Sequence, residues 1–121
     1  MSAQQKKAAP PEKVELYEKL VATNPGIERK GATYPYTSLN GNMFSYLHPS
    51  GSMALRLPQE EREKFLEKYK TTLFAVYGIV QKEYVTVPDS LLQKTRELRK
   101  YFAISYQYAQ TLKPKSTKKK R

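Results

Sequence analysis

Residues 30–57, KGATYPYTSLNGNMFSYLHPSGSMALRL, decide the fold of this chain. Polar and apolar side chains alternate along much of this stretch, which is typical of β-strands. Asn40-Gly41 indicates a tight hairpin, because both central residues of a type I′ turn need a positive φ. His48-Pro49-Ser50-Gly51 predicts a second turn. The stretch therefore predicts three antiparallel strands, at about residues 31–38, 42–47 and 52–57.

The two faces of this expected sheet differ in composition. With the second turn centred on Pro49 and Ser50, Tyr46 would lie opposite Met53, and Phe44 opposite Leu55. The expected core face consists of these last four residues and Leu57. The expected outer face consists of Tyr34, Tyr36, Met43, Leu47 and Arg56. Pro35 has no N–H for a ladder, so the first strand is expected at an edge or interrupted there.

Helical patterns flank the strands on both sides. Pro10-Pro11-Glu12 predicts a helix start, and Asn24-Pro25-Gly26 predicts its end. A second helix is expected to begin at Pro58, followed by a loop or short strand at residues 71–80 and a clearer strand at residues 84–87. Asp89-Ser90 predicts the cap of a last helix, whose apolar spacing continues for about six turns.

This order of elements indicates the fold class. A helix, three strands, a helix, one or two strands and a final helix predict an α+β domain with an antiparallel sheet of 4–5 strands and packed helices. A parallel sheet is not expected, because short turns join the first three strands. The folded domain is expected at residues 11–112, between disordered tails at residues 1–10 and 113–121.

The positive charge of the chain is concentrated in its tails. The formal net charge is +11, but residues 8–112 carry 14 Lys and Arg against 11 Asp and Glu. The last nine residues carry six cations and no acid, namely Lys113, Lys115, Lys118, Lys119, Lys120 and Arg121. A run of this kind on a tail either solvates the chain or binds polyanions without reading their sequence.

Composition and motifs exclude most catalytic classes. The chain has no cysteine, which fits a reducing compartment, and it has neither a secretory signal nor an apolar run of the ~20 residues that span a bilayer, so a cytoplasmic location is expected. His48 is the single histidine and is read as a turn residue, because metal and triad sites need several partners. The scattered glycines form no phosphate-binding loop. We therefore expect no enzyme activity, cofactor, metal or small-molecule substrate.

The middle of the chain resembles a known family. Asn40-Gly41-Asn42-Met43-Phe44, then His48 and Gly51, then Met53–Pro58 are similar to the central hairpin and the following strand of the TfoX N-terminal domain family. Tyr84–Pro88 and the long last helix extend the resemblance over residues 12–112. The resemblance implies a secretion-chaperone-like α+β fold and a bacterial, regulatory protein. It further implies a stand-alone member that lacks the second, helical domain found in competence regulators of that family.

Two binding hypotheses remain open at this point. The first is protein–protein association, including a homodimer, through the outer sheet face and a stripe on the last helix formed by Tyr101, Ile104 and Tyr108. The alternative is that other parts of the same chain cover these residues. The second hypothesis is weak, sequence-nonspecific binding of nucleic acid by the basic tail, extended by Lys94, Arg96, Arg99 and Lys100, with Tyr34 and Tyr36 stacking on bases.

Overall fold

The protein folds into a two-layer α+β domain, which confirms the predicted class. The computed structural model describes residues 9–31 and 33–114. In chain order, its elements are α1 (Pro11–Val21), β1 (Tyr36–Leu39), β2 (Asn42–Leu47), β3 (Met53–Arg56), α2 (Gln59–Tyr69), β4 (Leu73–Val76), β5 (Ile79–Val87), α3 (Asp89–Leu92) and α4 (Thr95–Thr111). The strands form one five-stranded antiparallel sheet in the order β1-β2-β3-β5-β4.

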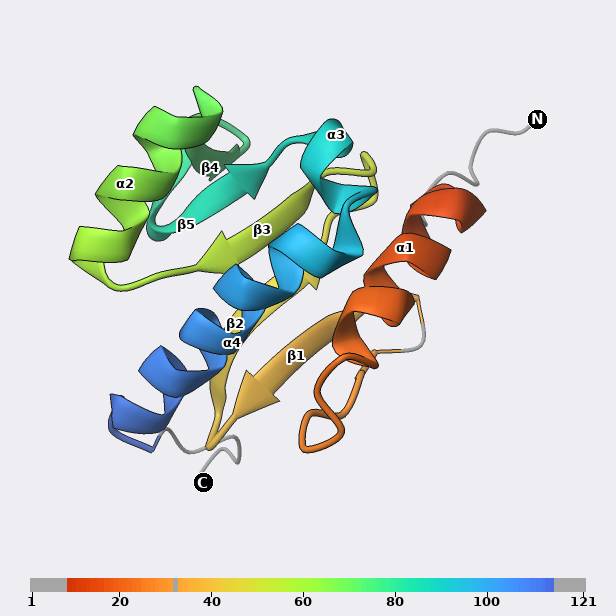
Figure 1. Cartoon of the computed structure of the whole chain (residues 1–121), viewed down its shortest axis with the longest axis horizontal. Coiled ribbons are helices and arrows are strands. Elements are labelled where there is room, and N and C mark those ends of the chain that lie inside the picture. The colour runs from red at the N-terminus through yellow and green to blue at the C-terminus, as the bar shows by residue number, and fades with distance from the viewer. Residues whose placement is uncertain (1–8, 32, 115–121) are drawn as a thin grey trace.

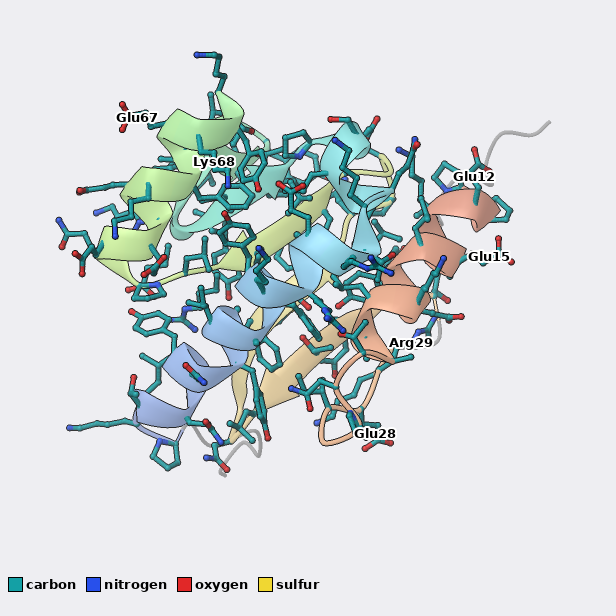
Figure 2. The ribbon with its side chains drawn as sticks, viewed as in Figure 1. Glu12, Glu15, Glu28, Arg29, Glu67 and Lys68 are labelled. Atoms are coloured by element: carbon teal, nitrogen blue, oxygen red, sulfur yellow. The ribbon has the colours of Figure 1, made fainter. Side chains whose placement is uncertain are left out.

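The helices cover one face of this sheet. In Figure 1, α1 and α4 lie side by side across the front of the sheet, and α3 leads into α4. The helix α2 packs beside α4, where the ring of Phe65 meets Tyr101 edge-on at 5.1 Å. The charged side chains labelled in Figure 2, on α1, on the loop that follows it and on α2, belong to the surface of this helical layer.

The core lies between α4 and the central strands. Phe44 of β2 packs between the rings of Phe102 and Tyr106, at 5.8 and 5.7 Å. The hydroxyl of Ser105 donates a hydrogen bond to the backbone carbonyl of Phe44 at 3.1 Å, which fixes α4 on the sheet. Leu98 of α4 is fully buried in the same cluster. Apolar burial along one helix stripe thus joins the two layers.

A bulge in β2 turns two consecutive side chains toward the helices. Thr37 pairs with Ser45, but the next residue, Ser38, pairs with Met43, so Phe44 is the extra residue. Both Phe44 and Ser45 are therefore buried on the helix side, while Met43 remains exposed on the other side. A bulge of this kind breaks the strict alternation that sequence patterns rely on.

The predicted register of β2 and β3 is wrong by one residue. Leu47, not Tyr46, lies opposite Met53, and Ser45, not Phe44, lies opposite Leu55. The connection is longer than a two-residue turn: His48 N–H bonds to the carbonyl of Ser52 at 2.8 Å, and Gly51 has a φ of 97°. A one-residue shift exchanges the faces of a strand. Leu47 is accordingly buried in the core instead of lying on the outer face, and Tyr46 leaves the core face.

Two element boundaries also differ from expectation. The first strand begins at Tyr36, because Gly31 with a φ of 82° makes a turn and Lys30 forms a single bridge with Tyr36. The last helix is divided at Gln93 and Lys94 into α3 and α4, and Asp89 makes no capping hydrogen bond. Its carboxylate instead pairs with Lys13 of α1 at 2.9 Å.

The expected disordered tails, apart from residues 9–10 and 113–114, lie outside the described residues. Within residues 9–31 and 33–114, no helix is long and apolar enough to cross a membrane.

Candidate functional site

The face of the sheet that lacks helices carries a groove of about 780 Å³. Its lining comes from the start of β1 and the loop before it, from β2 and the turn after it, and from the hairpin of β4 and β5. Among the described residues, none of its lining residues belongs to a helix, and none is an acid, a lysine or an arginine. Five of them are tyrosines: Tyr34, Tyr36, Tyr46, Tyr77 and Tyr84.

Packed aromatic rings form the floor of the groove. Tyr46 meets Phe74 edge-on at 5.5 Å and lies 5.8 Å from the ring of Tyr84. The hydroxyl of Tyr84 donates to the backbone carbonyl of Met43 at 2.6 Å, which fixes its ring across the intervening strand β3. Burial raises the pKa of both Tyr46 and Tyr84, so these phenols are neutral at physiological pH. The floor is therefore uncharged, aromatic and rigidly held.

The loop before β1 makes one wall of the groove, and its shape depends on Gly31. A Cβ atom at this position would lie 2.1 Å from the backbone oxygen of Tyr34. Only glycine combines that close approach with a φ of 82° at little cost. Arg29 donates a hydrogen bond to the carbonyl of Gly31 and pairs with Glu18 of α1 at 3.1 Å. The wall that presents Tyr34, half-exposed, is thus anchored to the helical layer.

Arg56 occupies the end of β3 beside the groove floor, in a network of contacts within the chain. Its Nε donates to the Glu83 carboxylate at 2.7 Å, and its guanidinium lies 5.6 Å from the ring centre of Tyr84. Tyr108 of α4 donates to the second oxygen of the same carboxylate at 3.0 Å. Burial opposes the charge on Glu83, but the hydrogen bonds from Arg56 and Tyr108 outweigh it and hold the pKa of Glu83 below its usual value.

Replacing Arg56 by methionine is expected to lower the free energy of unfolding by about 1–2 kcal/mol at pH 7. This loss is smaller than for a fully buried ion pair, because the Glu83 side chain is 36% exposed and solvent screens the interaction. The Glu83 pKa is lower in the folded state, so its ionic contribution is present above the unfolded pKa of ~4.3 and is lost as pH falls through the folded pKa. Urea titrations at several pH values from 7 to 3 should show that the difference in free energy of unfolding between wild type and Arg56→Met becomes smaller as the pH falls.

The matched control is the same substitution in a Glu83→Gln background. In that background the difference in free energy of unfolding should be smaller at pH 7 and nearly independent of pH, since the substitution then removes the packing of Arg56 on Tyr84 and Tyr108 and its bond to the Met43 carbonyl, but no ion pair. A gap of constant size from pH 7 to pH 3 in the wild-type background would contradict the ionic account.

The structure brings some of the predicted interface residues together and separates others. Tyr34, Tyr36 and Met43 line the groove, as the outer-face hypothesis requires. The predicted helix stripe lies apart from the groove: Tyr101 packs on Phe65 and Tyr69 of α2, and Ile104 is partly buried against the core. Tyr108 contacts Arg56 and Glu83. These three side chains therefore have partners within the chain.

The predicted nucleic-acid contacts divide into two places. Four of these residues are exposed on the opposite side of the sheet from Tyr34 and Tyr36: Lys94, immediately before α4, and Arg96, Arg99 and Lys100 on α4. Lys113 lies at the end of the β1–β2 hairpin, where Asn42 Nδ2 donates to its carbonyl at 2.8 Å. The other predicted tail cations, residues 115–121, lie outside the described residues. The described start of the tail is therefore held on the helical side of the sheet, since Asn42 and Met43 are successive residues of β2 and face opposite sides.

His48 lines the groove but has the contacts of a turn residue. Its Nδ1 accepts a hydrogen bond from the backbone N–H of Ser50 at 3.1 Å and lies 3.0 Å from the Ser50 hydroxyl. No carboxylate in the described part of the chain is hydrogen-bonded to its ring. Across the same residues, no group of three His, Asp or Glu side chains is placed to hold a metal ion.

Sequence reasoning missed half of the groove. The predicted register puts Tyr46 on the core face, and the pattern around Tyr84 predicts only a strand. Phe74 and Tyr77 fall in residues 71–80, where the pattern predicts a loop or short strand but no hairpin, although Tyr77-Gly78 forms a tight turn with positive φ at both residues. Asn40-Gly41 predicts a hairpin turn because both residues favour a positive φ, whereas a tyrosine before a glycine does not predict one.

Comparisons with known proteins add no functional information. No family model, curated protein or solved structure matches this chain. The resemblance to TfoX N-terminal domains therefore stays a prediction, and function has to be argued from the groove and the surfaces around it.

Proposed function

We propose that this protein is a non-enzymatic binding module that holds an extended segment of a partner protein in the tyrosine-lined groove. The carrying observation is the groove itself, a concave aromatic surface on a sheet face that no helix covers among the described residues. Tyrosine is enriched at protein interfaces, because its ring contributes contact area while its hydroxyl tolerates water.

The chemistry of the lining favours an uncharged, partly apolar segment. Met43 and Tyr34 are exposed by 38% and 52%, so apolar surface is available on both sides of the floor. The neutral phenols of Tyr46 and Tyr84 supply hydrogen-bonding groups without a formal charge that a partner would have to neutralise. A peptide with alternating aromatic or aliphatic side chains matches a sheet face with this spacing.

The same features argue against catalysis as the primary role. The aromatic floor contains no nucleophile paired with a base, and the Ser50–His48 contact is local to one turn. A cysteine-free chain also fits a reducing compartment, so we place this binding in the cytoplasm. The resemblance to TfoX N-terminal domains supports assigning the interaction to bacterial regulation.

The test is selection of a random peptide library on the full chain, followed by affinity measurement of the enriched peptides. Tyr34→Ala and Met43→Glu should each weaken binding at least about tenfold, because one removes ring contact and the other adds an unpaired carboxylate. Tyr34→Phe is the matched control and should retain affinity, since it keeps the ring. Peptides that bind all three variants equally, or no enrichment, would overturn the proposal.

A second candidate function is nonspecific binding of nucleic acid by the C-terminal tail. The observation that favours it is the hydrogen bond from Asn42 to Lys113, which holds the start of the tail at the β1–β2 hairpin, on the helical side of the strand whose next residue, Met43, faces the groove. Tyrosines there offer stacking surfaces, and the tail offers cations. In an electrophoretic assay, a chain ending at residue 112 should bind single-stranded DNA more weakly and with a smaller salt dependence. Equal binding by both chains would exclude a role for the tail.

A further inference from the structure

The β4 edge of the sheet is open. Among the described residues, β4 is the last strand and pairs only with β5. Val76 and Ile79 flank the two-residue turn, so the backbone groups of Val76 point toward β5. The N–H and C=O groups of Ala75, next to Val76, therefore point away from the sheet. The β4–β5 pairing is irregular between Leu73 and Ala75, but the carbonyl of Thr72 accepts from Thr86 N–H of β5 at 2.9 Å, so the backbone groups of the next residue, Leu73, also point away. These groups form a row that another strand can pair with.

The opposite edge is protected in the way natural sheets usually are. At β1, Lys30 N–H donates to the Tyr36 carbonyl at 2.8 Å, and Tyr36 N–H donates to the Lys30 carbonyl at 3.0 Å. The Lys30 ammonium also reaches the Ser38 hydroxyl at 3.3 Å, which places a charge along that edge. Charges, prolines and covering segments prevent unwanted pairing of edge strands. Residues 71–81 contain no charged residue and no proline.

The tip of the β4–β5 hairpin shows a second anomaly. Tyr77 has a φ of 53°, the same value as Asn40 in the β1–β2 hairpin, and each is followed by a glycine with positive φ. Asparagine suits this left-handed conformation, whereas tyrosine adopts it at a cost. The Tyr77 side chain is 96% exposed, and Ile79 and Val80 beside it are 67% and 50% exposed. Among the described residues, no contact within the chain offsets the conformational cost of a tyrosine at this position. This indicates that Tyr77 contacts another molecule.

We propose that β4 pairs antiparallel with β4 of a second copy of this chain, with Tyr77 and Ile79 buried at the margin of the interface. In the register that uses both outward residues, Leu73 of one copy faces Ala75 of the other, and the two-fold axis passes between the two Phe74 residues. The two five-stranded sheets then form one continuous sheet with both helical layers on the same side.

A second copy is favoured over other partners because pairing of two β4 edges produces a closed dimer. After the two β4 edges meet, both remaining edges of the joined sheet are β1, which Lys30 protects, so no further copy can add. Because residues 71–81 carry no charge, two chains of net charge +11 can meet there without like charges facing each other across the contact. Repulsion between the rest of the two copies is screened by salt, so the dimer should tighten as ionic strength rises. Nucleic-acid binding by the tail should show the reverse.

The test is sedimentation equilibrium of the full chain over the micromolar range. Wild type should show a closed monomer–dimer equilibrium. Ala75→Pro removes an outward N–H that the sheet does not use, and Ala75→Lys places a charge on the edge; each should weaken the dimer at least about tenfold. Gln107→Lys, an exposed site on α4, adds the same charge elsewhere and should leave the dimer unchanged. Circular dichroism confirms that each variant is folded.

Two further measurements make the result decisive. Tyr77→Asn should weaken the dimer by a similar factor while raising the thermal midpoint of the monomer, because asparagine relieves the left-handed turn. Amide exchange at Leu73 and Ala75 should slow as protein concentration rises. A monomer at all concentrations, a dimer that persists in both Ala75 variants, or growth beyond a dimer would each overturn the proposal. Tyr77 lines the groove and also belongs to this interface, so the variant that separates the two surfaces is Tyr34→Ala, next to the opposite edge of the sheet, which should leave the dimer intact.

Discussion

Replacing Phe44 by alanine is expected to lower the free energy of unfolding by about 3–5 kcal/mol, the usual range for removing a fully buried phenylalanine. The ring has no exposed surface and fills the space between Phe102 and Tyr106 of α4. Its loss leaves a cavity at the contact between the helical layer and the sheet. Urea unfolding followed by circular dichroism measures the change.

The adjacent residue provides a matched control for this prediction. Met43 precedes Phe44 in β2, but its side chain is 38% exposed on the other side of the sheet. Met43→Ala should therefore change stability by only about 0.5–1 kcal/mol. Equal losses in the two variants would mean that the bulge does not direct Phe44 into the core, and the face assignment of β2 would be wrong.

The strands were predictable where local chemistry alone fixes them. Asn40-Gly41 and the residues around it predict the first hairpin, because the turn conformation selects those two residues and the turn sets the pairing. Pro58 immediately precedes α2 in the structure, as expected, and Pro88 follows the end of β5 and precedes α3. The fold class follows from the order of such elements and needs no knowledge of their exact register.

The register and the β4–β5 hairpin were not predictable in the same way. The side-chain pattern does not reveal two features of the backbone, the three-residue connection after His48 and the bulge at Phe44. Each of them shifts the alternation by one residue. Their combined effect is visible in Leu47, which was expected outside and lies in the core. Tyr77 occupies a turn position that favours other residues, so local propensity points away from the observed hairpin.

The candidate site was predicted in part for the same reason. Tyr34, Tyr36 and Met43 are placed on the outer face by alternation within one hairpin. Tyr84 joins them only because β5 pairs with β3, a long-range pairing that no local pattern specifies. Helical spacing does not reveal the neighbours of Tyr101, whose ring packs on Phe65 and Tyr69 of α2 in the structure.

Replacing Ser45 by alanine is expected to cost about 2–4 kcal/mol, although only one oxygen atom is removed. Ser45 is the central member of a chain of three buried hydroxyls. Its Oγ lies 2.7 Å from the Tyr17 hydroxyl of α1 and 2.6 Å from the Thr37 hydroxyl of β1. All three side chains are fully buried, so the substitution strands two hydroxyls away from water.

The buried position of this chain is also seen in the titration of Tyr17. Burial raises the pKa of Tyr17 far above its ordinary value, which outweighs the opposing effect of the hydrogen bonds from Ser45 and Thr37. The phenol therefore stays neutral, and its only compensation for leaving water is hydrogen bonding. The penalty of Ser45→Ala is thus a desolvation penalty more than the loss of a favourable bond.

A compensation experiment distinguishes these two accounts. Adding Tyr17→Phe and Thr37→Val to Ser45→Ala removes the stranded hydroxyls while nearly preserving volume, and should recover more than half of the lost stability. If the triple variant is instead the sum of three independent losses, the hydroxyls do not act as a unit. Recovery would show that the contact between α1 and the sheet depends on complete satisfaction of polar groups, and that an apolar contact of the same shape can replace it.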